Sequence, residues 1–161
     1  MDQDSRFMRM ALELAAQSRE SREVPVGAVV AAAGEVIGRG RNSPIELCDP
    51  TAHAEILALR DAAALTGNYR LAGATLYCTV EPCLMCLGAM LHARIERLVF
   101  AAPDPKVSTT ARLAELKELG AVFNHDVEVR GGFLADEASG LLLEFFRARR
   151  NGGAVDREDR K

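Results

Sequence analysis

Two helical segments that are apolar on nearly every side constrain the fold of this chain more than any other feature. The first spans residues 51–65, the second runs from Pro82 to about Leu91, and residues 74–80 form a short apolar strand between them. A helix without a polar face needs partners around most of its surface. We therefore expect both helices to be buried against a sheet within one domain.

Further elements on either side of this unit alternate in type. Apolar periodicity predicts an amphipathic helix over residues 5–20, and two apolar runs around a turn at 33–35 predict a β-hairpin. The rest of the chain adds a strand in "RIERLVFAA", a charged helix near 110–119, a strand around 127–129 and a helix over 134–149. This order predicts an α/β layered domain with helices on both faces of the sheet.

Size and composition limit the class of protein. With 161 residues, of which 48% are hydrophobic, the chain can bury one sizeable core, so we expect a single domain over 1–150 and a disordered polar tail over 151–161. No apolar run is long enough to span a membrane, and charges near the N-terminus replace the apolar stretch of a secretory signal. A soluble, cytoplasmic protein is expected, whose four cysteines are metal ligands, redox groups or buried thiols.

The overall charge bears on nucleic-acid binding. A net charge of −3 and a pI near 5.7 argue against attraction of nucleic acid over the whole surface. The arginines of "FFRARR", at the end of the last helix, are either a local basic patch or cations that complement the helix dipole. Composition therefore leaves only a local nucleic-acid site open.

His53 and Glu55 are polar residues at the start of an otherwise apolar helix. Burial of an imidazole and a carboxylate without partners is unfavourable, so we expect partners for both. Residues two apart point about 200° apart around a helix and share no lateral face, yet both can reach a site at the helix N-terminus. The preceding "DPT" offers cap residues and a proline typical of such a start.

Cys83 and Cys86 open the next helix in a similar way. Pro82 suits a helix start, and the spacing of three places both sulfurs on one side of the first turn, where the helix dipole favours the metal-binding thiolate form. Two thiolates and the imidazole of His53 are ligands that zinc prefers, and a set of three leaves the open position of a catalytic site. Glu55 could then move protons to and from an activated water.

Each half of this pattern, taken alone, is also typical of different kinds of site. A Cys-x-x-Cys pair occurs as a redox dithiol, as half of a zinc site or in core packing, and a single histidine on an apolar helix is more often a satisfied buried residue. "HAE" at one helix start and "PCLMC" at another, with a strand between them, form a more specific combination. Of the remaining cysteines, Cys78 is expected to pack within its strand, and Cys48 lies in a loop.

Together, the two motifs resemble the His-x-Glu and Pro-Cys-x-x-Cys signature of zinc nucleobase deaminases. The stretches that look like bacterial-type tRNA adenosine deaminases are "EVPVGAVV", "RNSPIELCDPTAHAEILALR", "NYRLAGATLYCTVEPCLMCLGAMLHARIERLVF", "DPK" and "ADEASGLLLEFFRARR". The resemblance implies a cytidine-deaminase-like fold, a three-layer α/β/α sandwich with a central mixed sheet of about five strands. It also implies hydrolytic conversion of the wobble adenosine of a tRNA anticodon to inosine, by a homodimer with one Zn²⁺ per subunit.

The resemblance also implies roles for individual residues. His53, Cys83 and Cys86 would hold Zn²⁺, and Glu55 would carry protons from the attacking water to the adenine ring and to the departing amine. Substrate contacts would come from Asn42, the backbone amide of Ala54, Asp104 beside the nucleic-acid backbone, and Phe145 or Phe146 near the flanking nucleotides. By residue type alone, the asparagine is equally a turn former, and the phenylalanines are core residues.

After "DPK" the chain departs from the pattern of these deaminases. The family usually has a short run of glycine, alanine and a hydroxyl residue there, whereas this chain has "VSTTARL" over 107–113, with Val107 and Thr109 less free than glycine. We expect this departure to affect tRNA specificity more than the chemistry. Three hypotheses follow: a tRNA adenosine deaminase, a related deaminase of free bases or nucleosides such as guanine or cytosine, and a non-catalytic zinc-stabilised binding module.

Overall fold

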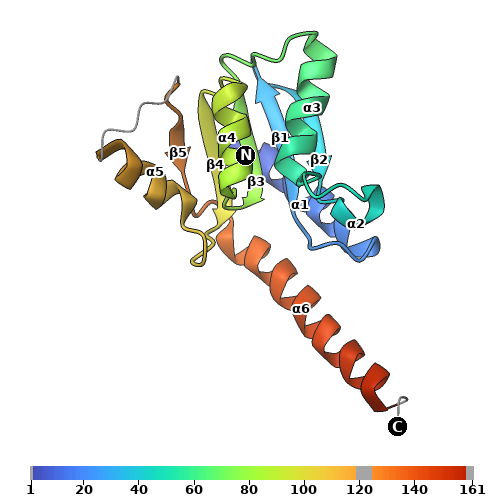
Figure 1. The fold of residues 1–161 in the computed structure, drawn as a ribbon. Helices are drawn as coiled ribbons and strands as arrows, with labels where there is room; N and C mark the ends of the chain where they lie inside the picture. Colours follow the sequence, from blue (N-terminus) through green and yellow to red (C-terminus); the bar gives the residue numbers. More distant parts are fainter. Residues whose placement is uncertain (1, 119–124, 159–161) are drawn as a thin grey trace.

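The computed structural model describes residues 2–118 and 125–158, which form a five-stranded mixed sheet between two layers of helices (Figure 1). The strands are β1 (Gly27–Ala32), β2 (Glu35–Arg41), β3 (Thr75–Val80), β4 (Arg97–Ala102) and β5 (Glu128–Arg130). They lie in the order β2-β1-β3-β4-β5. β1 pairs antiparallel with β2 and β3, whereas β3, β4 and β5 run parallel to one another.

The helices α1 (Gln3–Glu20) and α6 (Ala135–Glu158) cover one face of the sheet. The side chain of Asp2 caps α1 by accepting a hydrogen bond from the Ser5 N–H at 2.7 Å. The core of this layer includes Phe7, Met8, Ala11, Val29, Tyr77, Val99 and Ala138. Figure 1 shows that the C-terminal part of α6 continues away from the sheet.

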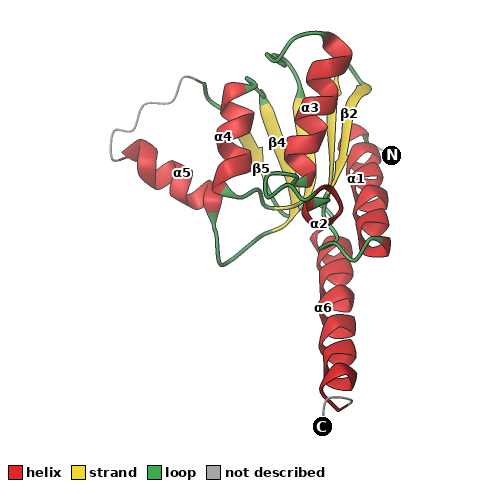
Figure 2. Cartoon of the chain, turned by 45° about the vertical axis from the view of Figure 1, so that its right-hand side comes forward, coloured by secondary structure: helices red, strands yellow, loops and turns green. Residues whose placement is uncertain are grey.

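The helices α3 (Ala54–Thr66) and α4 (Leu84–His92) cover the opposite face of the sheet, as Figure 2 shows. The core of this layer includes Val30, Ala58, Leu59, Leu76, Leu87, Met90 and Leu98. α5 (Thr109–Glu118) follows β4 and adds Leu113 to the same core. A short helix, α2 (Pro44–Leu47), connects β2 to the segment before α3.

Two glycines of β2 allow α3 to lie unusually close to the sheet. A Cβ atom on Gly40 would lie 2.1 Å from the carbonyl oxygen of Ala54, and one on Gly38 would lie 2.3 Å from that of Ala58. Real Cβ atoms essentially never come this close to a backbone oxygen. The sheet therefore fixes the first turns of α3 through direct backbone contact.

The predicted three-layer sandwich with a mixed five-stranded sheet is confirmed, with three differences in detail. α3 begins at Ala54, so His53 is its N-cap and "DPT" lies before the cap. α2 has no counterpart in the prediction. α6 was expected to end near Arg149 but continues to Glu158, which covers most of the segment predicted as a polar tail, while 159–161 lie outside the described residues.

No helix in the described ranges is both long enough and apolar enough to cross a membrane.

Candidate active site

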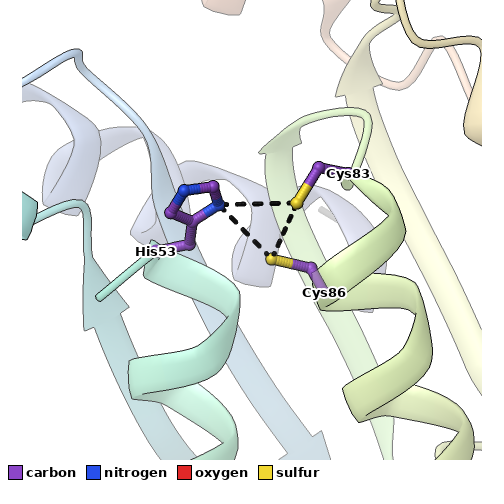
Figure 3. A group of neighbouring side chains, drawn as sticks. All are labelled: His53, Cys83 and Cys86. Carbon is purple, nitrogen blue, oxygen red and sulfur yellow. Dashed lines mark hydrogen bonds between the residues drawn. The ribbon is translucent and has the colours of Figure 1, made fainter. Parts of the chain in front are cut away.

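Two helix starts present their side chains to each other across the site. His53 is the N-cap of α3 and Cys83 is the N-cap of α4, and neither side chain hydrogen-bonds back to its own helix as N-cap residues commonly do. Cys86 lies in the first turn of α4. Figure 3 shows the Nδ1 atom of His53 and the two sulfurs pointing toward one another. Because α3 and α4 cover the same face of the sheet, their N-termini can form one site.

The three ligand atoms form a nearly equilateral triangle. His53 Nδ1 lies 3.6 Å from each sulfur, and the sulfurs of Cys83 and Cys86 lie 3.6 Å apart. Tetrahedral zinc with Zn–S bonds of about 2.3 Å and a Zn–N bond of about 2.0–2.1 Å separates its ligand atoms by roughly 3.5–3.8 Å. The donor set and the spacing therefore fit a zinc ion, and three protein ligands leave one position for a small molecule.

The pKa values of His53 and Cys83 reflect the contact between these two side chains. A hydrogen bond with Cys83 raises the pKa of the His53 imidazole, although burial opposes the shift. Hydrogen bonds from Cys86 and His53 lower the pKa of the Cys83 thiol. Negative charge is thus favoured on a sulfur that faces the site, which is the form of cysteine that binds a cation.

Glu55 lies in the first turn of α3 and is only 4% exposed. Burial raises the pKa of its carboxyl group, although a backbone hydrogen bond and the nearby His53 act in the opposite direction. A carboxyl group whose pKa is raised by burial holds a proton more readily than an exposed one, and can take and return it. Glu55 is therefore suited to proton transfer beside the ligand triangle.

A cavity of about 470 Å³ opens over this group, within the usual range of roughly 300–1,000 Å³ for small-molecule sites. Several chain segments contribute to its wall. The lining residues are Val24, Val26, Asn42, His53, Glu55, Val80, Glu81, Cys83, Pro103, Asp104, Pro105, Lys106, Leu142 and Phe146. His53, Cys83 and the proton-transfer group thus share a cavity with residues from the 103–106 loop and from α6, and Cys86 lies buried beside them.

The predicted substrate contacts differ in how they relate to this cavity. Asn42 and Asp104 line it, whereas Ala54 is fully buried and is not among the lining residues. Phe145 is also buried, at 6% exposure, and Phe146, at 43% exposure, is the phenylalanine that lines the cavity. The two rings touch edge to face with their centroids 5.4 Å apart, so Phe145 supports Phe146 from behind.

Several lining residues were missed by the sequence prediction. Glu81, Lys106 and Leu142 belong to the cavity wall, and Glu81 is buried at 7% exposure. A sequence signal existed for Glu81, since a carboxylate between a buried strand and Pro82 needs partners. Of the two cysteines outside the triangle, Cys78 is buried in β3 as expected, and Cys48 is exposed at the C-terminal cap of α2.

Comparison with known proteins identifies the class to which this geometry belongs. Residues 1–102 match the model of the cytidine and deoxycytidylate deaminase zinc-binding region. With the sandwich fold, the His-Cys-Cys triangle and the buried glutamate, this match defines a zinc-dependent deaminase, and the chain belongs to this family. Among curated relatives, it is 47% identical over 155 residues to the tRNA-specific adenosine deaminase of Haemophilus influenzae, with 96% of this chain and 89% of the relative covered.

Further relatives and solved structures agree with this placement. The tRNA-specific adenosine deaminase of Bacillus subtilis is 43% identical, with 91% of each chain covered. A structure from a study of A-to-I editing by tRNA:A34 deaminases at the wobble position superposes with a TM-score of 0.79 at 40% identity, covering 86% of this chain and 99% of that one. The guanine deaminase of Nitrosomonas europaea superposes with a TM-score of 0.70 at 28% identity, covering 86% and 82%.

Proposed function

We propose that this chain catalyses the hydrolytic deamination of adenosine to inosine at the wobble position of a tRNA anticodon. The observation that carries the proposal is the triangle of His53, Cys83 and Cys86 ligand atoms, 3.6 Å apart, at a cavity that is lined by His53, Cys83 and the buried Glu55. The relatives named tRNA-specific adenosine deaminases, at 47% and 43% identity, support the choice of adenosine in tRNA.

In this proposal His53, Cys83 and Cys86 hold Zn²⁺, which when bound activates a water molecule for attack on the adenine ring. Glu55 accepts a proton from the attacking water and delivers it to a ring nitrogen. It then takes the second proton, from the oxygen that is now bonded to the ring, and transfers it to the exocyclic amine, which leaves as ammonia. Water and adenosine thus give inosine and ammonia, and Glu55 ends in its starting state. Burial raises the pKa of Glu55, which favours the protonated form through which each transfer passes.

The cavity wall supplies three of the proposed substrate contacts, and the start of α3 supplies the fourth. The amide of Asn42 hydrogen-bonds the target nucleoside, and the backbone N–H of Ala54, the first residue of α3, contacts the base. Asp104 lies beside the RNA backbone. Phe146, supported by Phe145, offers a ring on which a flanking nucleotide can stack.

We also propose a homodimer that acts in the cytoplasm, where tRNA is found. Leu84 and Met85 lie at the start of α4, beside the ligands, and are 57% and 38% exposed. Large apolar side chains exposed together favour a protein partner. Sedimentation at micromolar concentration should give twice the mass of one chain, and a monomer under these conditions would contradict the dimer.

The direct test uses an anticodon stem-loop with adenosine at the wobble position. We expect inosine from the wild-type protein and no inosine from the Glu55→Ala variant, because the buried carboxyl group that carries the proton is then missing. Both proteins should contain about one zinc per chain, since Glu55 is not among the three ligands. Retained zinc in the variant excludes unfolding as the reason for the lost activity.

Different results would assign different functions. Deamination of free guanine or cytosine with an inert stem-loop would favour a base deaminase, which the structural likeness to a guanine deaminase makes the relevant alternative. Full biological function of Glu55→Ala would indicate a zinc-stabilised binding module without catalysis.

A further inference from the structure

Glu81 is a buried carboxylate in the cavity wall that the deamination chemistry does not use. It directly follows β3, and its N–H donates to the carbonyl oxygen of Ala102 at 2.8 Å, which extends the pairing of β3 with β4 by one residue. Two positions further along lies the ligand Cys83. The backbone at Glu81 is therefore fixed both to the sheet and to the start of α4.

The carboxylate of Glu81 accepts one hydrogen bond from the loop after β4 and two from the first turn of α5. Its Oε2 atom accepts from the Asp104 N–H at 3.0 Å. Its Oε1 atom accepts from the Thr110 N–H at 3.0 Å and from the Thr110 hydroxyl at 2.6 Å. The two oxygens thus hold the two ends of residues 104–110, called the 104–110 loop here, which run from the loop after β4 into the first turn of α5. Hydrogen bonds to an ionised acceptor are stronger than neutral ones.

The loop itself is a closed turn around Asp104. The carbonyl oxygen of Asp104 accepts from the N–H groups of Val107 and Ser108 at 3.2 and 2.8 Å, and its Oδ1 atom accepts from the Lys106 N–H at 3.0 Å. Ser108 has a φ of 42°, a backbone conformation in the left-handed region. A turn closed in this way moves as a unit, so its position depends on the anchor at Glu81.

The opposite wall of the cavity is held by the same kind of contact. Glu23 is 2% exposed, and its Oε1 atom accepts from the N–H groups of Ile45 and Glu46 at 2.7 and 2.9 Å. These residues follow Asn42, whose own N–H donates to the carbonyl oxygen of Val26 at 2.9 Å. Two buried carboxylates therefore fix the cavity wall. Glu23 holds the segment that follows Asn42, and Glu81 holds the segment that contains Asp104.

We propose that Glu81 is a positioning residue for the deaminase reaction, which fixes the 104–110 loop relative to Cys83 so that Asp104 meets the RNA at a set distance from the reacting base. The inference rests on the proposed function. It assigns a use to the "VSTTARL" segment, because Thr110, which lies within that segment, supplies two of the three donors.

The test compares two neighbouring threonines. Thr110→Val removes the hydroxyl that donates to Glu81, Thr110→Ser keeps it, and Thr109→Val removes a buried hydroxyl that has no hydrogen-bond partner in the described part of the chain. We expect Thr110→Val to raise the KM for the stem-loop about tenfold, as expected for loss of a hydrogen bond to a charged group, with kcat and zinc content unchanged. Thr110→Ser and Thr109→Val should keep the wild-type KM.

A double-mutant cycle tests whether Glu81 acts through Asp104. Glu81→Gln should raise the KM in the wild-type background and have no further effect in an Asp104→Ala background, because the group to be positioned is then missing. Equal effects in both backgrounds, or a Thr110→Val variant with unchanged KM, would overturn the proposal. Failure of the wild-type protein to form any inosine would instead overturn the proposed function.

Discussion

His53 and Cys83 combine a structural position with a chemical one. Each is the N-cap of its helix and has an extended backbone, with φ and ψ of −70° and 152° for His53 and −74° and 171° for Cys83. A side chain at the N-cap lies at the N-terminal end of the helix and not on its lateral face. Because neither side chain is used for capping, the imidazole and the sulfur remain available to bind a metal ion.

The metal site gives a prediction for single cysteines. Cys83→Ser should lose zinc and, with it, the activation of the attacking water. We expect activity to fall roughly a thousandfold or more, which corresponds to a loss of about 4 kcal/mol of transition-state stabilisation. Cys48→Ser is the control, since Cys48 is exposed and lies outside the ligand triangle. Zinc content per chain and the effect of a chelator on the melting temperature are the measurements. Full zinc content in Cys83→Ser would show that the metal lies elsewhere.

The clustering of His53, Cys83 and Cys86 and the buried position of Glu55 could be predicted from the sequence, because residue type and spacing define them. The choice between Phe145 and Phe146 could not, since neighbouring residues of a helix point about 100° apart and only the packing of α6 decides which ring faces the cavity. The partners of Glu81 were also hidden, because they lie 23 and 29 residues further along the chain, and two of the three donors are backbone groups.

At the scale of elements, the contact between α3 and β2 sets the position of His53. The backbone of α3 rests directly on Gly38 and Gly40, without intervening side chains. Any side chain at these two strand positions must push the helix outward. The ligand at the start of the helix would then move with it.

A prediction for this contact compares Gly40, which packs against α3, with Gly140, where an added Cβ has free space. Gly40→Ala should destabilise the protein by about 1–3 kcal/mol and weaken zinc retention, because its Cβ would lie 2.1 Å from the Ala54 carbonyl oxygen. Gly140→Ala in α6 is the control: a Cβ there meets nothing within 4 Å, and alanine favours a helix by roughly 0.5–1 kcal/mol over glycine. Chemical denaturation with parallel zinc analysis distinguishes the two, and equal stability of both variants would contradict the close-contact argument.

Long elements with clear periodicity were predicted well, and the exceptions have physical causes. α2 has only four residues, too few to show a period, and the distant carboxylate of Glu23 bonds its N–H groups. The extent of α6 was underestimated because "NGGAVDREDRK" is polar and contains glycines, which by composition favour a disordered tail.

At the scale of the whole molecule, Asp4 connects the beginning of the chain to three strands that lie much further along the sequence. Its carboxylate accepts from Arg97 at 3.0 and 2.6 Å, from Arg130 at 3.1 Å and from the Tyr77 hydroxyl at 2.7 Å, and its side chain is 14% exposed. Burial and the hydrogen bond to Asp4 raise the pKa of Tyr77 to about 12, so Tyr77 remains a donor at physiological pH. α1 is thereby tied to β3, β4 and β5 at one point.

This network predicts a pH-dependent contribution to stability. Hydrogen bonds from Arg97 lower the pKa of Asp4 below its ordinary value of 3.8, against the opposing effect of burial. The stabilisation is therefore fully present above that value and is lost as the pH falls through the lower pKa of the folded state. Asp4→Asn should reduce the free energy of unfolding by about 1–3 kcal/mol at pH 7, and the difference from wild type should shrink below about pH 4.

The control for this prediction is Glu128→Gln. Glu128 approaches the same guanidinium of Arg97 at 3.7 Å, but its side chain is 73% exposed, so its contribution should be close to zero. Denaturant titrations of the three proteins between pH 3 and pH 7 measure both effects. A constant difference between Asp4→Asn and wild type over this whole range would contradict the assigned titration.

A cation held by His53 and Cys83 joins two points of the backbone that are thirty residues apart. In an unfolded chain, closing such a loop reduces conformational entropy and costs about 3–4 kcal/mol. In the folded chain the sheet and two helices already hold the same points together, so this entropy is lost before the ion arrives. The ion therefore acts as a reversible cross-link, and the native chain should retain it far more tightly than the denatured chain.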